Sequence, residues 1–331
     1  MGGAYAIPIS SNGGYRRCAP APDGCSKVLR GNADNFNREF SVLSKPVIQA
    51  NGMRPGPARD YLHNVMEGHP LPSVPVVANK LLEIVQDPEV SMQKLCRVLA
   101  DDPMLAARVL AVSRSPRYAL RNLPTTLLGA VQVLGFRTLT SVVVTSATQS
   151  LRLKGNKISE QLWRHSLGAA LAMRILCQRA RSRDDEIGFL TGLMHDVGQM
   201  VFVHGDPAGY ENLLKENQAA PRPIVDVERE VYGVDHAVMG HTILNRWNLD
   251  GQIIHATLKH HSDGAGPNDL ANLLTVADYL CWRCNLGFFT EPTPPPPELL
   301  AKYGLNDAAV MAQLIEEVME TYREESLIFE K

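Results

Sequence analysis

The sequence lacks the features that assign a chain to a membrane, secreted or nucleic-acid-binding class. No apolar run approaches the roughly 20 residues that a membrane span requires, and residues 1–11 lack the basic and apolar regions of a secretory signal. The 33 lysines and arginines balance 35 aspartates and glutamates, so a formal net charge of −2 offers no overall field to nucleic acid. Six cysteines, dispersed over 331 residues, do not form a disulfide framework. We therefore expect a cytoplasmic protein whose partners are neither membranes nor nucleic acids.

Common nucleotide-binding and hydrolase motifs are missing as well. The sequence contains no Walker loop and no glycine-rich dinucleotide fingerprint. It also lacks the Gly-x-Ser-x-Gly elbow, so nothing in it supports a serine hydrolase.

Apolar residues at helical spacing dominate the chain from about residue 71 onward. Ser91 is placed to cap a short helix, and Asp102 followed by Pro103 opens another, because proline suits the first helical turn. Gly135 separates two further helical segments, 125–134 and 137–151. More helices are expected at 159–179 with Ser159 as cap, 186–203, around 213–215, 224–232, 236–247, 251–260 and 270–284. Such a succession of helices predicts an all-α fold.

The two ends of the chain have a different texture. Residues 1–58 are rich in glycine and proline with little periodicity, which predicts a flexible leader. Residues 289–331 combine a proline-rich connector with a C-terminal helix at about 306–325, whose apolar face should pack on the body. The prolines at 292–297 favour a stiff polyproline spacer over a binding motif for an SH3-like partner.

Seven histidines and aspartates stand out because they recur in order along the helical part of the chain. They are His165, His195, Asp196, His236, His260, His261 and Asp278. Imidazole nitrogen and carboxylate oxygen are ligands for Zn, Fe, Mn and similar divalent ions, so these residues could share one metal site. The alternative is that their polar groups hydrogen-bond one another and hold the helices together.

Several motifs in this order resemble the HDOD family, the HD-related output domains of bacterial signalling. The resemblance covers about residues 65–285 and rests on LPSVP at 71–75, DPMLAARVL at 102–110, residues 113–118, AVQVLG at 130–135, WRHS at 163–166, GLMHDVG at 192–198 and HAVMG at 236–240. It implies a multi-helix HD-like bundle in which an N-terminal helical half, residues 59–152, packs on an HD-like half, residues 153–288. It also implies a regulatory output protein that works through contacts with signalling proteins, such as a response regulator, a kinase or a cyclic dinucleotide enzyme, and without catalysis.

The second half also resembles the HD-GYP phosphodiesterases, which implies an alternative function. In that comparison His165, His195, Asp196 and Asp278 form the central ligand set, and the other three histidines occupy the positions of a second metal ion. A divalent metal (Fe, Mn, Zn or Mg) would then support a cyclic dinucleotide phosphodiesterase or a nucleotide phosphohydrolase. The helical pattern places the His195-Asp196 pair in the middle of a helix.

Three departures weaken the catalytic alternative. Gln161 stands where such enzymes often place a carboxylate, and an amide is a poorer metal ligand. Gln199 replaces a lysine that can steady a scissile phosphate. The Gly-Tyr-Pro signature is faint at 262–267, where the tyrosine is absent.

Two smaller groups complete the candidates. A cluster of arginines could hold an anion or an acidic partner, although a solvated basic face is the simpler interpretation: Arg114, Arg117, Arg121 and Arg137. Cys281 and Cys284 share a predicted helix without a second cysteine pair, which favours packed thiols over a metal or redox site.

Overall fold

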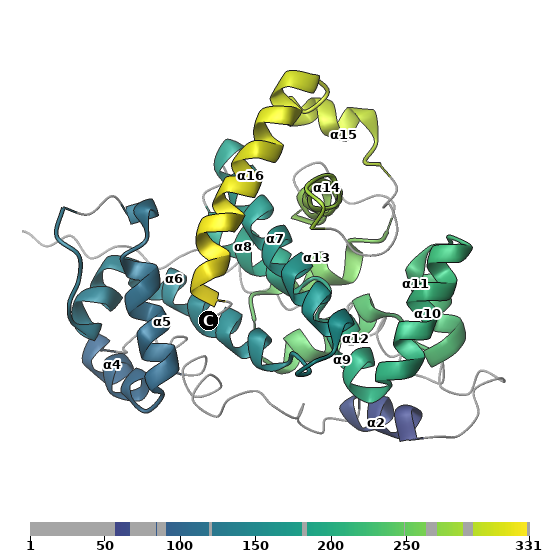
Figure 1. The fold of residues 1–331 in the computed structure, drawn as a ribbon, viewed down its shortest axis with the longest axis horizontal. Coiled ribbons are helices and arrows are strands. Elements are labelled where there is room, and N and C mark those ends of the chain that lie inside the picture. The colour runs from purple at the N-terminus through teal and green to yellow at the C-terminus, as the bar shows by residue number, and fades with distance from the viewer. Residues whose placement is uncertain are drawn as a thin grey trace, which may run out of the picture. The chain divides into compact units, whose positions relative to one another are not determined.

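All of the regular structure in the described residues is helical, which confirms the predicted all-α fold. The computed structural model describes residues 57–66, 84, 91–118, 121–180, 184–247, 249–262, 270–286 and 294–329, all within a compact unit of residues 51–331. Its elements (Figure 1) are α2 (Pro57–Met66), α4 (Met92–Ala100), α5 (Pro103–Ser113), the 3-10 turn η2 (Pro116–Tyr118), α6 (Leu127–Ser150), α7 (Lys157–Arg179), α8 (Asp185–Met194), α9 (Val197–Gly205), α10 (Pro207–Ala219), α11 (Ile224–Tyr232), α12 (His236–Arg246), α13 (Gly251–Lys259), α14 (Leu270–Arg283), α15 (Pro297–Lys302) and α16 (Ala308–Phe329).

The starts of α4 and α5 follow from local capping. The Ser91 side chain accepts a hydrogen bond from the Lys94 amide at 3.2 Å. One carboxylate oxygen of Asp102 accepts from two amides of the first turn of α5 at 3.0 Å, and Pro103 occupies the first helical position. Both predicted caps are therefore confirmed, because each satisfies backbone donors that a helix start leaves free.

Helix α6 is long, apolar and interrupted. Gly135 has φ 71° and ψ 175°, so it breaks the helical geometry where the sequence predicted a division. By length and composition α6 could cross a membrane, which corrects the expectation that no segment approaches such a length. Half of its most apolar window is buried within the protein, where α6 packs on α4, α5 and α8. A core helix passes the same test, so this criterion alone is weak evidence for a membrane segment.

Helix α7 lies at the centre of the fold and is buried on most of its circumference. Its buried residues include Trp163, Leu167 and Leu171, and it packs against α8, α9, α14 and α16. The helix begins two residues earlier than predicted, because Asn156, and not Ser159, is the cap and accepts from the amide of Ser159 at 2.8 Å. Helix α7 therefore provides the scaffold on which α8 and α14 are arranged.

The predicted helix 186–203 is wrong in one respect that matters for the site. It is divided into α8 and α9, and His195 and Asp196 form the junction between them instead of the middle of one helix. The backbone of Asp196 has φ −102° and ψ 14°, outside the helical region. The two side chains are therefore presented at a helix end.

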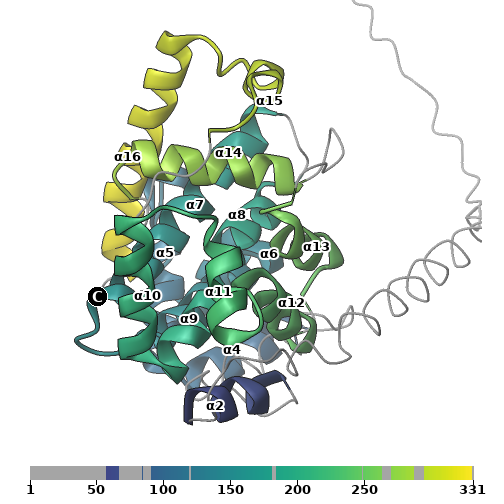
Figure 2. The same ribbon diagram turned by 90° about the vertical axis from the view of Figure 1, so that its right-hand side faces the viewer.

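Two terminal helices pack on this core. The buried residues of α16 include Leu314, Val318 and Tyr322, and the helix runs along α7 and reaches α5 and α6 (Figures 1 and 2). This confirms that the predicted C-terminal helix packs on the body. Helix α2 packs on α9. The predicted flexible leader, residues 1–58, lies outside the described residues apart from Pro57 and Ala58.

Candidate metal centre

Two histidines of the candidate site end their helices in the same way. His195 follows the last residue of α8, and its Nδ1 lies 2.7 Å from the carbonyl oxygen of Gly192. His260 follows the last residue of α13, and its Nδ1 lies 2.6 Å from the carbonyl oxygen of Thr257. A carbonyl only accepts, so each Nδ1 donates and each ring turns its Nε2 away from the helix. The imidazole rings at the ends of α8 and α13 thus lie close together in the candidate site.

The first donor set joins α7, the α8 end and α14. The Nε2 atom of His165 lies 3.2 Å from Nε2 of His195 and 3.2 Å from Oδ1 of Asp278. The Nδ1 atom of His165 is 3.2 Å from the carbonyl oxygen of Leu286, which fixes the ring. The donor atoms of these three side chains lie within 4.8 Å of one another.

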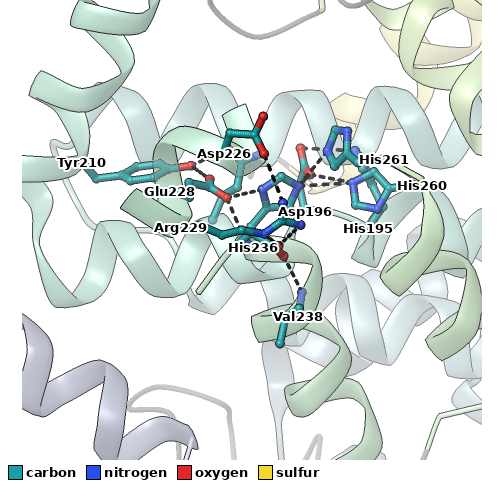
Figure 3. Close-up of polar contacts among 12 residues, drawn as sticks. His195, Asp196, Tyr210, Asp226, Glu228, Arg229, His236, Val238, His260 and His261 are labelled. Atoms are coloured by element: carbon teal, nitrogen blue, oxygen red, sulfur yellow. Dashed lines mark hydrogen bonds and ion pairs between the residues drawn. The ribbon is translucent and has the colours of Figure 1, made fainter. Parts of the chain in front are cut away.

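The second donor set joins the start of α12 and the end of α13 (Figure 3). The Nε2 atom of His236 lies 3.0 Å from Nε2 of His261 and 3.3 Å from Nε2 of His260. His236 is the first residue of α12. The carboxylate of Asp235 caps this helix by accepting a hydrogen bond from the backbone amide of its third residue. Three imidazole nitrogens therefore converge at one point.

Asp196 lies between the two sets and faces both. Its Oδ2 atom is 3.2 Å from Nε2 of His195 and 3.5 Å from Nε2 of His165. Its Oδ1 atom is 3.3 Å from Nε2 of His236 and 3.6 Å from Nε2 of His260. The structure thus brings together all seven side chains that the sequence singled out, with one carboxylate oxygen directed at each set.

The electrostatics of this arrangement fit bound cations. In the neutral rings of His165 and His195, Nδ1 faces a carbonyl oxygen and donates, so both Nε2 atoms carry lone pairs. These lone pairs face each other at 3.2 Å, and such an approach repels unless a proton or a metal ion lies between them. Deprotonated imidazole and carboxylate are the donors that divalent transition metals prefer. The residues present therefore fit two divalent ions.

Protons compete for the same atoms. Burial lowers the pKa of His165, but the hydrogen bond and charge of Asp278 outweigh it and raise the pKa to about 9. Burial likewise lowers the pKa of His236, and Glu228 with Asp196 raises it to about 9. Burial also opposes ionisation of Asp196, yet the neighbouring imidazoles hold its pKa well below the usual range. Without metal, the centre therefore keeps protons on one imidazole of each set.

The other two histidines of the second set behave differently. Burial lowers the pKa of His260, and burial together with the charges of His260 and His236 lowers the pKa of His261 well below its usual value. Neutral imidazoles are the form in which histidine binds metals.

Residues of the centre differ in their exposure to solvent. Asp196 is 5% exposed and His236 is fully buried. By contrast His261 is exposed, and the side chain of Asp278 is 27% exposed. A small ligand from solvent could therefore reach the edge formed by these two residues.

The departures from HD-GYP enzymes have structural counterparts. Gln161 is exposed, and Gln199 is buried with its amide 3.0 Å from the hydroxyl of Tyr210. In the segment 262–267 only Ser262 lies within the described residues, and it is exposed. No described cation therefore occupies the place of the phosphate-binding lysine.

The sequence analysis did not identify Glu228, whose carboxylate contacts Nδ1 of His236. The signal was present in α11, where Val225, Glu228 and Tyr232 are the buried residues at helical spacing. A glutamate on the buried stripe of an amphipathic helix needs a polar partner. Here that partner is a histidine of the second donor set, at 2.6 Å.

The predicted arginine cluster lies elsewhere in the fold. Arg117 pairs with Glu186 at 2.9 Å, and Arg137 pairs with Asp184 at 2.6 Å. Arg114 donates to a backbone carbonyl at 2.8 Å, and Arg121 is exposed. Arg117 and Arg137 thus connect the region around α6 to the start of α8, and the predicted binding of an anion or partner stays a prediction.

Cys281 in α14 and Cys284, the residue that follows the helix, are buried free thiols. Burial raises the pKa of Cys281 well above its usual value and raises the pKa of Cys284 to about 11. Thiols in this state are poor nucleophiles and poor metal ligands, as expected for packed side chains.

This chain matches one domain family and several solved structures. The HDOD domain model matches residues 71–263. An HDOD domain protein of unknown function from Geobacter sulfurreducens is 23% identical with a TM-score of 0.63, over 81% of this chain and 97% of that one. A provisionally named phosphohydrolase from Shewanella amazonensis SB2B is 23% identical with a TM-score of 0.60, over 82% and 97% of the two chains. These likenesses show the fold.

Two further relatives extend the comparison. A provisionally named signal transduction protein from Marinobacter aquaeolei VT8 is 19% identical with a TM-score of 0.64, over 83% of this chain and 66% of that one. An uncharacterised protein from Treponema pallidum (strain Nichols) is 22% identical over 228 residues, which are 67% of this chain and 44% of that protein. This chain thus spans less than half the length of its curated relative.

Proposed function

We propose that this chain, which belongs to the HDOD domain family, is a signalling protein whose HD-like half binds two divalent metal ions and which acts through contacts with another signalling protein. The main support for this proposal is the position of Asp196. Its two oxygens face two separate groups of imidazole nitrogens, at 3.2 to 3.6 Å. A carboxylate so placed can be shared by two cations, and hydrogen bonds among neutral rings cannot satisfy every nitrogen of the two groups.

The proposed metal residues are the seven that converge: His165, His195 and Asp278 in the first set, His236, His260 and His261 in the second, and Asp196 between them. Fe, Mn and Zn suit a donor set rich in imidazole, whereas Mg²⁺ prefers oxygen ligands. When bound, such ions would supply a Lewis acid and could lower the pKa of a bound water.

The signalling part of the proposal draws on the family and on the fold. One structural relative carries the name of a signal transduction protein. Within the HD-like half, Gln199 is held by Tyr210 and presents no charge to a phosphate. These features favour a regulatory domain that acts by binding a partner protein in the cytoplasm.

A second candidate is a metal-dependent phosphohydrolase, acting on cyclic dinucleotides or on nucleotides. The observation in its favour is the exposure of His261 and the partial exposure of Asp278, at which a substrate from solvent could contact the donor sets. A structural relative is also provisionally named a phosphohydrolase.

Metal analysis of protein purified without chelators tests the proposal. We expect two divalent ions per chain in the wild type and their loss in Asp196→Ala. Asp226→Ala is the matched control, because this aspartate is half-exposed and pairs on the surface with Arg229. A wild-type protein that binds no Fe, Mn or Zn would contradict the metal centre.

Hydrolysis assays with added Mn, Fe or Mg separate the two functions. We expect no turnover of cyclic dinucleotides or nucleotides, together with a protein partner that co-purifies with the wild type. Turnover that disappears in Asp196→Ala and persists in Asp226→Ala would replace this proposal by the phosphohydrolase.

A further inference from the structure

Glu228 is a fully buried carboxylate that supports one side of the metal centre (Figure 3). Its Oε2 atom accepts from the backbone amide of His236 at 2.8 Å and lies 2.6 Å from Nδ1 of the same residue. Its Oε1 atom accepts from the hydroxyl of Tyr210 at 2.6 Å. A carboxylate with three donors around it has a fixed position, and it fixes the ring of His236 in turn.

The hydroxyl of Tyr210 links Glu228 to Gln199. The hydroxyl carries one hydrogen, and Glu228 offers it only acceptor atoms. Oε1 of Gln199, 3.0 Å from the same hydroxyl, is a second acceptor for that hydrogen. Gln199, Tyr210 and Glu228 thus form one polar network, and all three side chains are buried.

Among the described residues, the first donor set has no carboxylate behind an imidazole. Nδ1 of His165 is held by the neutral carbonyl of Leu286 at 3.2 Å, and Nδ1 of His195 by the carbonyl of Gly192 at 2.7 Å. A carboxylate behind a metal-binding imidazole raises the basicity of the ring more than a carbonyl does, because it carries a full charge. The two sets also differ in composition, since the second has three imidazoles and the first has two with the partly exposed Asp278.

We propose that Glu228 is a positioning residue that makes the set of His236, His260 and His261 the tighter of the two metal positions. The inference rests on the proposed function, because it assumes that the centre binds metal. It adds that the two positions differ in affinity, and that Glu228 sets this difference through the orientation and basicity of His236. Zn²⁺ should therefore fill the three-imidazole set first, since Zn²⁺ favours nitrogen donors.

Zn²⁺ titration of the metal-free full-length protein tests this proposal, with a chelating indicator resolving two dissociation constants. His261→Ala identifies the step that belongs to the three-imidazole set, and Asp278→Asn identifies the other. Glu228→Gln keeps the size and an acceptor for His236 but removes the charge. We expect it to weaken the step identified by His261→Ala by about 10 to 100-fold and to leave the other step unchanged.

Glu230→Gln is the matched control, because this glutamate lies on the same helix α11 with its side chain 59% exposed and paired with Arg222. It should leave both constants at their wild-type values. The ratio of the two constants is the decisive readout, since a merely structural role of Glu228 would weaken both steps alike.

The outcomes are distinguishable. Wild-type protein that binds two Zn²⁺ while Glu228→Gln keeps both constants, or weakens both equally, overturns the positioning role and leaves the metal centre in place. Wild-type protein that binds no Zn²⁺ overturns the proposed metal centre and, with it, this inference.

Discussion

Replacing Glu186 by glutamine tests whether a buried charge joins η2 and α6 to α7 and α8. Glu186 lies in the first turn of α8 and is 6% exposed. Ser141 of α6 donates to it at 2.6 Å, Arg117 at 2.9 Å and Arg174 of α7 at 3.4 Å. Three parts of the fold therefore meet at one carboxylate.

The magnitude follows from which of these contacts survive. Glutamine keeps the size and one acceptor oxygen, so the hydrogen bond from Ser141 is retained while the charge is lost. Arg174 keeps a second partner, Glu325 at 3.1 Å, and the Arg117 side chain is 27% exposed, so water stabilises part of its charge. Hydrogen bonds to charged groups contribute about 1.5–3 kcal/mol each. We expect Glu186→Gln to lower the free energy of unfolding by about 2–3 kcal/mol, less than the 3–5 kcal/mol for an isolated buried pair.

The effect has a defined dependence on pH. Burial raises the pKa of Glu186, but Arg174, Ser141 and Arg117 outweigh burial, so its pKa lies below the usual value. A carboxylate whose pKa is lower in the folded state stabilises the fold above its unfolded pKa and loses that contribution as the pH falls through the folded pKa. The stability advantage of the wild type over Glu186→Gln should therefore shrink as the pH falls below the unfolded pKa of about 4.3, and it should disappear below the folded pKa.

Urea unfolding of the metal-free protein at pH 7 and pH 4, followed by circular dichroism, measures both effects. Glu160→Gln is the control, because its side chain is 61% exposed and lies 3.9 Å from Arg152. It should change the stability by less than about 0.5 kcal/mol. A Glu186→Gln variant that unfolds at the wild-type urea concentration at pH 7, or a difference that widens as the pH falls, would refute this reasoning.

Three further predictions concern the centre and its supports. Removal of bound metal by a chelator should lower the thermal unfolding midpoint of the wild type, since a ligand at 100 times its Kd stabilises the folded state by about 2.7 kcal/mol. An Asp196→Ala variant whose midpoint also falls with chelator would contradict the proposed metal site. Gly198→Ala would place a Cβ 2.1 Å from the carbonyl oxygen of His236 and should cost about 1–3 kcal/mol or more, whereas Gly251→Ala meets nothing within 4 Å and should be neutral or stabilising in thermal unfolding. Asp235→Ala removes the cap of α12 and should cost about 1–2 kcal/mol by urea unfolding, while Asp235→Asn should keep most of the stability, and equal losses in both variants would disprove the capping role.

Helix starts governed by a few neighbouring residues were predictable from the sequence. Ser91 and Asp102 cap α4 and α5 as expected, and α11 has the predicted bounds, Ile224–Tyr232. In each case the signal is a polar cap or a turn next to an apolar stripe, and both partners lie within one helical turn. Local chemistry is sufficient for such features.

Competition between two local signals was not resolved by the sequence. Asn156 and Ser159 both favour a cap, and they are three residues apart. Asn156 caps α7, which places Ser159 inside the first turn, where its hydroxyl accepts from the amide of Leu153 at 2.9 Å. The choice depends on the preceding loop, whose backbone the sequence pattern does not describe.

The division between α8 and α9 was also beyond the sequence pattern, because the apolar spacing continues through it. No proline marks the junction, and Val197 and Val201 extend the periodicity. The break instead accompanies a side-chain contact, in which the ring of His195 bonds the carbonyl of Gly192 in the last turn of α8. The spacing of apolar residues indicates which residues are buried, but it does not indicate which donor bonds a backbone carbonyl at a helix end.

The convergence of the seven donors depends on how closely the helices approach, and two glycines around the His195-Asp196 pair permit that approach. A Cβ on Gly192 would lie 2.4 Å from the carbonyl oxygen of Ala169 in α7, and one on Gly198 would lie 2.1 Å from the carbonyl oxygen of His236 in α12. The first contact brings the pair toward His165 on α7, and the second brings it toward the start of α12. Each glycine thus permits a close helix contact on the side of one of the two donor sets. The motif of residues 192–198 therefore combines two helix contacts with two of the proposed metal donors, and widening either contact should separate Asp196 from one set while leaving the other intact.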